Sequence, residues 1–254
     1  MVDFISAFYE KAQDLNWEVS GLISPGSSVY SLGSDSKLIG RIFELISTGA
    51  VKDIAQEHGL QLEASPQQTV YPDFTLIDPS DPSTKIAVDV KSTYRKFTAK
   101  GEIRPFRFTL GSYASFLRNG TKNIAYPYEE YVKHYVIGFV YTRNPQIDEG
   151  QEYAVADLPQ IAVPYHDVEY FVQEKHRVSG YQPGSGNTEN IGTFSSADVD
   201  DFRKGEGPFA ELGEWAFELY WRNYPKYRAA ERAYTDLEGF LQWAKEQGYS
   251  IQPR

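Results

Sequence analysis

The run Tyr-Val-Ile-Gly-Phe-Val-Tyr-Thr at residues 135–142 constrains the fold of this chain more than any other segment. It contains β-branched and aromatic residues in an almost continuous apolar series, without a charged side chain. Such a series is typical of a buried strand at the centre of a sheet. The same composition predicts shorter strands at residues 60–63, 73–77, 85–91, 106–109 and 168–173. The turn-forming residues 78–83 predict that the second and third of these strands form a hairpin.

Helical periodicity flanks the predicted strands on both sides. Apolar residues recur at helical spacing over residues 2–16 and 36–58, with Gly59 as a C-terminal cap, and again over 208–247. Gly49 is a point at which the second helix would bend or break, and residues 180–192 are expected to form a Gly-rich loop. This order predicts an α/β or α+β fold, in which one domain over residues 1–254 has a mixed central β-sheet flanked by helices.

Residue usage excludes several classes of protein. The chain has no Cys, so disulfides and thiolate metal sites are impossible. Its four His residues show no paired metal-ligand spacing, which argues against a zinc site. No Rossmann glycine pattern and no Gly-x-Ser-x-Gly motif is present. We see no signal peptide and no apolar run long enough to span a bilayer, so we expect a soluble cytoplasmic protein that does not bind membranes.

The charge of the chain is unevenly distributed. The net charge is −10, yet residues 91–122 carry eight Lys or Arg against one acid, and residues 144–174 carry seven acids and no Lys or Arg. A basic segment within an acidic protein suggests a local anionic ligand, such as nucleic acid, with the acidic remainder limiting indiscriminate binding. The alternative is an ordinary mixed surface that binds nothing.

Asp73, Asp89 and Lys91 are the residues best suited to chemistry. Asp89 and Lys91 lie two positions apart after an apolar stretch, so on a strand both point to the same face. Asp73 opens the neighbouring hairpin strand and can lie beside Asp89. Two convergent carboxylates favour Mg²⁺, and a lysine beside the metal can orient an attacking water or offset charge on a phosphate. The alternative is a surface salt bridge between Asp89 and Lys91.

Glu44 lies among apolar residues of the second predicted helix. With Lys37, Arg41 and Thr48 it forms a polar stripe on that helix. As an additional carboxylate it could hold a second metal ion or orient water. The alternative is a solvated ion pair with Arg41.

Two polar segments are candidates for DNA recognition. The segment Gly-Ser-Gly-Asn-Thr-Glu-Asn at residues 184–190 has small residues that allow close approach of a ligand, and Asn and Thr can bond base edges in the major groove. It lacks the Gly-Lys-Ser/Thr ending of a nucleotide-binding loop. Residues 67–69, Gln-Gln-Thr, precede Asp73 and could face a groove. The alternative for both segments is an ordinary surface loop.

The chain resembles the EcoRV-like type II restriction endonucleases of the PD-(D/E)xK nuclease superfamily. The motif is carried by Tyr71-Pro72-Asp73 and by Asp89-Val90-Lys91. The similarity covers most of the chain, in order, through residues 32–37, 42–45, 71–76, 86–91, 108–113, 121–124, 140–143, 184–188 and 220–224.

This resemblance implies a homodimer that clamps double-stranded DNA, with dimerisation elements mainly in the N-terminal part of the chain. It also implies Mg²⁺-dependent in-line hydrolysis that leaves blunt ends at a short palindromic site, and GATATC is the natural expectation. Asp73 and Asp89 would bind the metal ion and Lys91 would be the catalytic lysine. Glu44 would be an accessory acid and metal ligand.

The resemblance assigns DNA contacts as well. The base-reading residues of the major groove would be Gly184, Gly186, Asn187 and Thr188. Gln67, Gln68 and Thr69 occupy the place of the minor-groove loop. The phosphate contacts would come from Thr93, Ser115 and Lys122.

Some residues depart from the family pattern. Thr69 and Val70 replace more polar residues, and Glu189 brings a negative charge into the recognition loop. These changes affect sequence preference more than cleavage chemistry. Two alternatives therefore stay open: a related PD-(D/E)xK nuclease of different or relaxed specificity, and a DNA-binding protein that has lost cleavage.

Overall fold

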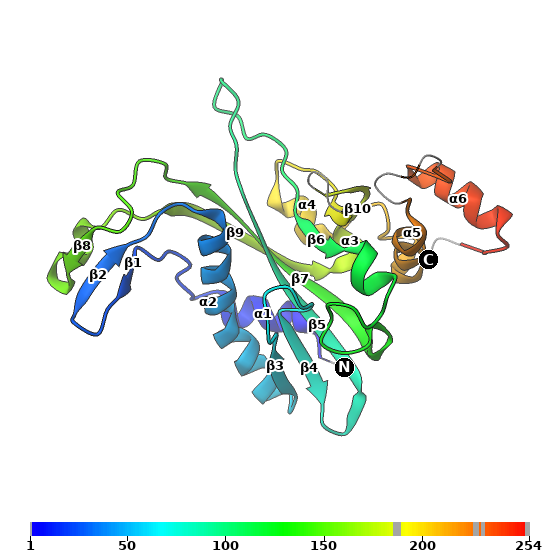
Figure 1. The fold of residues 1–254 in the computed structure, drawn as a ribbon, viewed down its shortest axis with the longest axis horizontal. Helices are drawn as coiled ribbons and strands as arrows, with labels where there is room; N and C mark the ends of the chain where they lie inside the picture. Colours follow the sequence, from blue (N-terminus) through cyan, green and yellow to red (C-terminus); the bar gives the residue numbers. More distant parts are fainter. Residues whose placement is uncertain (1, 185–188, 226–228, 230–231, 252–254) are drawn as a thin grey trace.

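A mixed five-stranded sheet forms the centre of the computed structural model, which describes residues 2–184, 189–225, 229 and 232–251. The strand order is β3-β4-β5-β7-β9 (Figure 1). The pair β5–β7 is parallel and the other neighbours are antiparallel. Their bounds are β3 Gln61–Ala64, β4 Phe74–Asp78, β5 Asp81–Tyr94, β7 Tyr131–Arg143 and β9 Tyr165–Glu174. The predicted central strand 135–142 lies within β7, which is bordered on both sides, so the mixed sheet is confirmed.

The predicted hairpin is confirmed as β4–β5. Asp78 pairs with Asp81 at its tight end, where the Ser80 backbone N–H donates to Asp78 Oδ1. Along β5, the side chains of Ile86, Val88 and Val90 pack against one face of the sheet. Because side chains alternate along a strand, Asp89 and Lys91 point to the opposite face.

Two helices cover the first of these faces. These are α1 (Phe4–Ala12) and α2 (Ser36–Glu57), and both were predicted. Asp35 caps α2 by accepting from two backbone N–H groups, and Gly59, with φ +65°, follows its end as expected. The expected break at Gly49 is wrong: α2 is continuous, because the buried residues around it, Ser47, Ala50 and Val51, anchor both halves. This packing outweighs the roughly 1 kcal/mol by which glycine disfavours a helix.

The opposite face of the sheet is covered by the C-terminal part of the chain. Its core joins Ala87, Val136, Val140 and Phe171 of the sheet to aromatic residues of α5. The helices here are η1 (Tyr113–Leu117), η2 (Tyr128–Glu130), α3 (Lys175–Val178), α4 (Val199–Lys204), α5 (Gly213–Asn223) and α6 (Leu237–Glu246). The helical prediction for 208–247 is therefore confirmed in α5 and α6.

A second sheet on this side corrects two predictions. It has the order β10-β11-β6, with bounds β10 Ser179–Pro183, β11 Asn190–Thr193 and β6 Thr109–Ser112. Of the predicted loop 180–192, residues 180–183 and 190–192 are thus paired strands, and residues 185–188 lie outside the described residues. Glycine lets the two backbones approach closely: a Cβ on Gly192 would lie 3.0 Å from Gln182 O. The strand expected at 106–109 begins instead at Thr109, and Phe106 forms an isolated bridge with Ser196.

A small third sheet was not predicted. It has the order β1-β2-β8 and comprises β1 Gly21–Ile23, β2 Ser28–Ser31 and β8 Glu152–Ala154, followed by η3 Val155–Gln160. These strands are too short to show a period. In Figure 1 the sheet lies at one end of the molecule, with α5 and α6 at the other. Within the described ranges, no helix is long and apolar enough to cross a membrane.

Candidate active site

Asp73, Asp89 and Lys91 meet at the edge where β4 begins; we call them the carboxylate–lysine group. Lys91 Nζ lies 2.8 Å from Asp89 Oδ2 and 3.8 Å from Asp73 Oδ2. The register Phe74↔Val88 places Asp73, just before β4, across from Asp89. Asp73 is held there because its Oδ2 accepts the Val90 backbone N–H at 2.7 Å. The convergence expected from the spacing of these residues is therefore present.

The lysine balances two carboxylates that are poorly solvated. Burial, with a smaller contribution from the Asp89 carboxylate, raises the pKa of Asp73 to about 7 against the opposing effect of Lys91. Burial alone would lower the pKa of Lys91, but the carboxylates of Asp89 and Asp73 outweigh it and the pKa is raised. The group thus keeps a protonated lysine beside a carboxyl whose charge is costly.

Asp89 offers an oxygen that is suited to a cation. Its side chain is 3% exposed, and its Oδ2, although close to Lys91, has no hydrogen-bond partner of good geometry among the described residues. A buried carboxylate oxygen needs a compensating positive charge, which Lys91 supplies in part and a metal ion would complete. With Asp73 beside it, the donor set is two hard oxygens, which fits Mg²⁺.

A cavity of about 310 Å³ opens over the carboxylate–lysine group. Four further predicted residues line it, namely Gln68, Thr69, Ser115 and Lys122. Ser115 is buried and its hydroxyl donates to the backbone oxygen of Lys122 at 2.9 Å, which joins these two residues. Two of the three predicted minor-groove residues and two of the three predicted backbone-contacting residues therefore share one cavity with the two aspartates.

Other predicted residues lie outside this cavity. Among the described residues, the cavity lining does not include Glu44, Gln67 or Thr93. Thr93 follows Lys91 on the same face of β5 and pairs with Val140 of β7. The backbone oxygen of Gln67 accepts from the Ser65 hydroxyl.

Glu44 is ion-paired with Arg41 in this structure, as the alternative interpretation had it. Its carboxylate is close enough to raise the pKa of Asp73, yet among the described side chains it forms no three-ligand group with the two aspartates. Its role as an accessory acid and metal ligand stays a prediction.

The recognition loop is described only in part. Gly184 lies at the end of β10, where its N–H donates to Asn190 O at 2.8 Å. Gly186, Asn187 and Thr188 lie outside the described residues. The position of Gly184 next to β6 is tight, since a Cβ there would lie 3.1 Å from Thr109 Oγ1.

Tyr71 is a site residue that reasoning from the sequence missed. It lines the cavity and precedes Asp73 by two residues, and its ring stacks on Phe116, another lining residue, at 4.4 Å. Its hydroxyl is 2.7 Å from Nδ1 of His134. Only its proximity to Asp73 in the chain could have indicated it.

Comparison with known proteins identifies the family of this chain. Residues 13–245 match the model of the family described as "Restriction endonuclease EcoRV". The chain is 41% identical over 243 residues to the type II restriction enzyme EcoRV of Escherichia coli, covering 95% of this chain and 96% of that protein. The structure of the NlaIV restriction endonuclease aligns over 99% of this chain and 91% of its own, with a TM-score of 0.41 and 11% identity. That last likeness is too distant to carry an argument.

Proposed function

This chain belongs to the EcoRV family of type II restriction endonucleases, and from that premise we propose that Asp73, Asp89 and Lys91 are its catalytic residues. As a site-specific deoxyribonuclease it hydrolyses DNA phosphodiesters. The proposal rests on one observation above all: both carboxylates converge on a single lysine at the base of a cavity.

We propose Mg²⁺ as the cofactor, held by Asp73 and Asp89. When bound, Mg²⁺ supplies Lewis-acid stabilisation of charge on the phosphate and lowers the pKa of coordinated water. Lys91 supplies the side-chain donor of the reaction. Asp89 positions its ammonium to orient the attacking water and to donate to a phosphate oxygen. The Val90 N–H fixes the Asp73 carboxylate, so that this second carboxylate stays close to Asp89 and Lys91.

The cavity lining supports binding of duplex DNA. Lys122 and Ser115 would contact the phosphate backbone, with Thr93 further along β5. Gln68 and Thr69 would face the minor groove beside the scissile phosphate, with Gln67 next to them. Gly184, Gly186, Asn187 and Thr188 would read bases in the major groove. A short palindromic GATATC-like site cut to blunt ends is the specificity we propose.

We propose that the enzyme acts as a homodimer, because a palindromic site matches a two-fold axis. Apolar side chains are exposed on the small third sheet and the adjoining η3, namely Leu22, Ile23, Tyr30, Val155 and Leu158. Such a group of apolar side chains is suited to contact with a second copy. A cytoplasmic location, where intracellular DNA is accessible, completes the proposal.

Digestion of a plasmid with MgCl₂ tests the function. We expect discrete fragments whose mapped ends are blunt and lie within one palindrome, and a synthetic duplex with one altered base pair in that palindrome should resist cleavage. A smear would favour the relaxed-specificity nuclease. Wild-type protein that binds DNA and never cuts it would favour the DNA-binding alternative and contradict the proposal.

Variants test the assignment of residues. Asp89→Ala and Lys91→Ala should abolish cleavage while retaining DNA binding. Their matched controls are Asp53→Ala and Lys52→Ala, exposed residues of α2 that carry the same charges. Full cleavage by Asp89→Ala would show that the catalytic residues lie elsewhere, whatever the specificity.

A further inference from the structure

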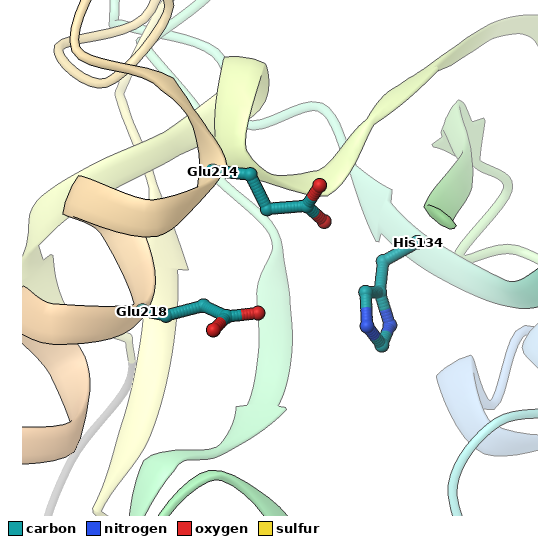
Figure 2. A group of neighbouring side chains, drawn as sticks. All are labelled: His134, Glu214 and Glu218. Carbon is teal, nitrogen blue, oxygen red and sulfur yellow. The ribbon is translucent and has the colours of Figure 1, made fainter. Parts of the chain in front are cut away.

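A second group of ionisable side chains lies on the same face of the central sheet as Asp89. His134 of β7 pairs with Ala87 of β5, two residues from Asp89, and points to the side covered by α5. Figure 2 shows Glu214 and Glu218 of α5 extending their carboxylates toward the His134 ring. One ligand atom from each of the three residues lies within 4.8 Å of the others. We call these residues the histidine–carboxylate group.

His134 has an imidazole nitrogen that lacks a partner. The side chain is 2% exposed, and its Nε2 has no hydrogen-bond partner among the described residues. Its other nitrogen, Nδ1, is 2.7 Å from the Tyr71 hydroxyl. Tyr128 stacks on the ring at 4.6 Å and fixes its plane. If Nδ1 carries the proton and donates it to Tyr71 Oη, Nε2 presents its lone pair, which is the arrangement typical of metal-ligating histidines.

The two glutamates are one helical turn apart and are costly to ionise where they lie. Burial, together with repulsion from Glu218, raises the pKa of Glu214 to about 7. Burial likewise raises the pKa of Glu218. Arg222 pairs with Glu218 at 3.5 Å near the surface, whereas Glu214 has no ion pair within the described part of the chain. Two half-buried carboxylates therefore share little positive charge.

Nearby lysines compensate the pair only in part: their charges lower the pKa of the glutamates, but burial outweighs them. Lys133 is ion-paired with Glu174. Lys175 is 1% exposed, and its Nζ lies over the rings of Tyr71 and Phe116 at 4.2 and 4.7 Å without a hydrogen-bond partner in the described structure. Burial lowers the pKa of Lys175 to about 8, so this lysine is mostly protonated at pH 7 but can readily lose its proton when a cation binds nearby.

We propose that His134, Glu214 and Glu218 bind a divalent cation of the Zn²⁺ class, separate from the catalytic Mg²⁺. One imidazole nitrogen and carboxylate oxygens suit Zn²⁺ better than Mg²⁺, which prefers oxygen ligands and retains its water. Glu218 also lines a cavity of about 490 Å³, together with Tyr128 and Arg222 among others. The bound ion connects α5 to the central sheet, and through Tyr71 it adjoins the active-site cavity.

The spacing of the residues explains why this site was missed. His134 is 80 positions from Glu214, and no other His or Cys stands nearby in the chain at ligand spacing. The expectation that the histidines show no zinc site rested on sequence spacing alone. It is the packing of α5 on β7 that brings these ligands together.

The proposal is tested by calorimetric titration of ZnCl₂ into DNA-free Asp89→Ala protein. The protein is first stripped of metal with EDTA and dialysed. The Asp89→Ala change removes a ligand of the proposed Mg²⁺ site, so binding there does not mask the second site. We expect one Zn²⁺ per chain and a rise in Tm with ZnCl₂, with MgCl₂ at the same concentration giving neither. Adding Glu214→Gln and Glu218→Gln should weaken Zn²⁺ binding by about 100-fold or more, since each removes a direct ligand.

The matched control carries Glu206→Gln and Glu211→Gln, two exposed residues that give the same change in charge. This control should bind Zn²⁺ like its parent. His134→Gln should also abolish binding, and because it alters a buried residue its fold is checked by circular dichroism. Unchanged Zn²⁺ affinity in the Glu214→Gln/Glu218→Gln protein overturns the proposal. A parent protein that shows no Zn²⁺ binding in the calorimeter overturns it as well.

Discussion

The carboxylate–lysine group and the histidine–carboxylate group lie on one face of the central sheet, and they differ in how charge is balanced. In the first, two carboxylates share Lys91 at 2.8 and 3.8 Å and open onto a cavity. In the second, two carboxylates face an imidazole whose Nε2 has no partner within the described residues. Tyr71 joins them, since it lines the cavity and contacts His134.

The two groups differ in whether a lysine lies beside the carboxylates, and this difference determines how much each site depends on a cation. A lysine beside two carboxylates keeps the site folded before a cation arrives and supplies a donor for the reaction. A site without such a lysine gains more from the cation itself, because the cation is then the main source of compensating charge. The first arrangement suits a reactive site and the second suits a structural ion.

The largest expected effect comes from removing the lysine. Lys91→Gln should reduce the single-turnover cleavage rate by about 10³-fold, because both charge stabilisation and water orientation are lost. DNA binding, measured by gel shift in CaCl₂, should persist. A fall of less than tenfold would mean that Lys91 only stabilises the fold. Glu214→Gln, measured beside it, should leave the rate within a few fold and so separate the two groups.

The pH dependence of stability should be similar at the two groups. The pKa of Asp73 and that of Glu214 are each about 7 in the folded, metal-free protein, above their ordinary values. A carboxyl whose folded pKa is raised contributes stability that is fully present below pH 4 and is lost as the pH rises through 7. The loss per group is at most about 4 kcal/mol, since each pKa unit corresponds to 1.36 kcal/mol.

Denaturant unfolding in EDTA from pH 4 to 8 measures this pH dependence of the free energy of unfolding. Asp73→Asn and Glu214→Gln should each flatten the fall in the free energy of unfolding between pH 4 and 7. Added MgCl₂ should raise stability at pH 8 more than at pH 5 in wild type. Parallel curves for wild type and a variant would show that the replaced carboxyl does not titrate in this range.

A smaller effect is expected from the link between the groups. Tyr71→Phe keeps the ring in the cavity and removes the hydroxyl that contacts His134 Nδ1. Leaving a buried polar atom without its partner costs about 1–3 kcal/mol in the free energy of unfolding. Tyr126→Phe is the control, since it removes a hydroxyl that donates to Glu63 in a more solvated place. Equal losses in both variants would contradict a special role for the Tyr71–His134 contact.

The smallest effect on stability is expected at Glu44. Because Glu44 pairs with the exposed Arg41, Glu44→Gln should change the free energy of unfolding by less than about 0.5 kcal/mol. Any drop in cleavage is then attributable to its charge near Asp73. A cleavage rate equal to that of wild type would remove Glu44 from the active site and leave the ion pair as its whole role.

Much of the fold followed from periodicity in the sequence. The run 135–142 predicted a central strand because few arrangements can bury so many apolar side chains in succession. The hairpin carrying Asp73 and Asp89 followed from turn residues between two apolar stretches, and the period of two placed Asp89 and Lys91 on one face. Each of these inferences uses residues that are near one another in the chain.

The errors occurred where local pattern is weak. The strands β1, β2 and β8 are three or four residues long, and β10 and β11 are four or five residues long with one Gly each. Such segments become strands because a partner backbone is available, not because their own residues favour extension. Glu44 illustrates the same limit, since its spacing fitted both an ion pair and a metal ligand.

By itself the sequence determined the chemistry available at the carboxylate–lysine group, because Asp73, Asp89 and Lys91 lie on two strands joined by one turn. Only the tertiary structure decided what surrounds that group: the cavity lined by Gln68, Ser115 and Lys122, and Tyr71 behind it. It alone brought His134 to Glu214 and Glu218. The physical reason is that long-range register and burial, which no local period encodes, determine which distant side chains meet and which of their polar atoms lose water.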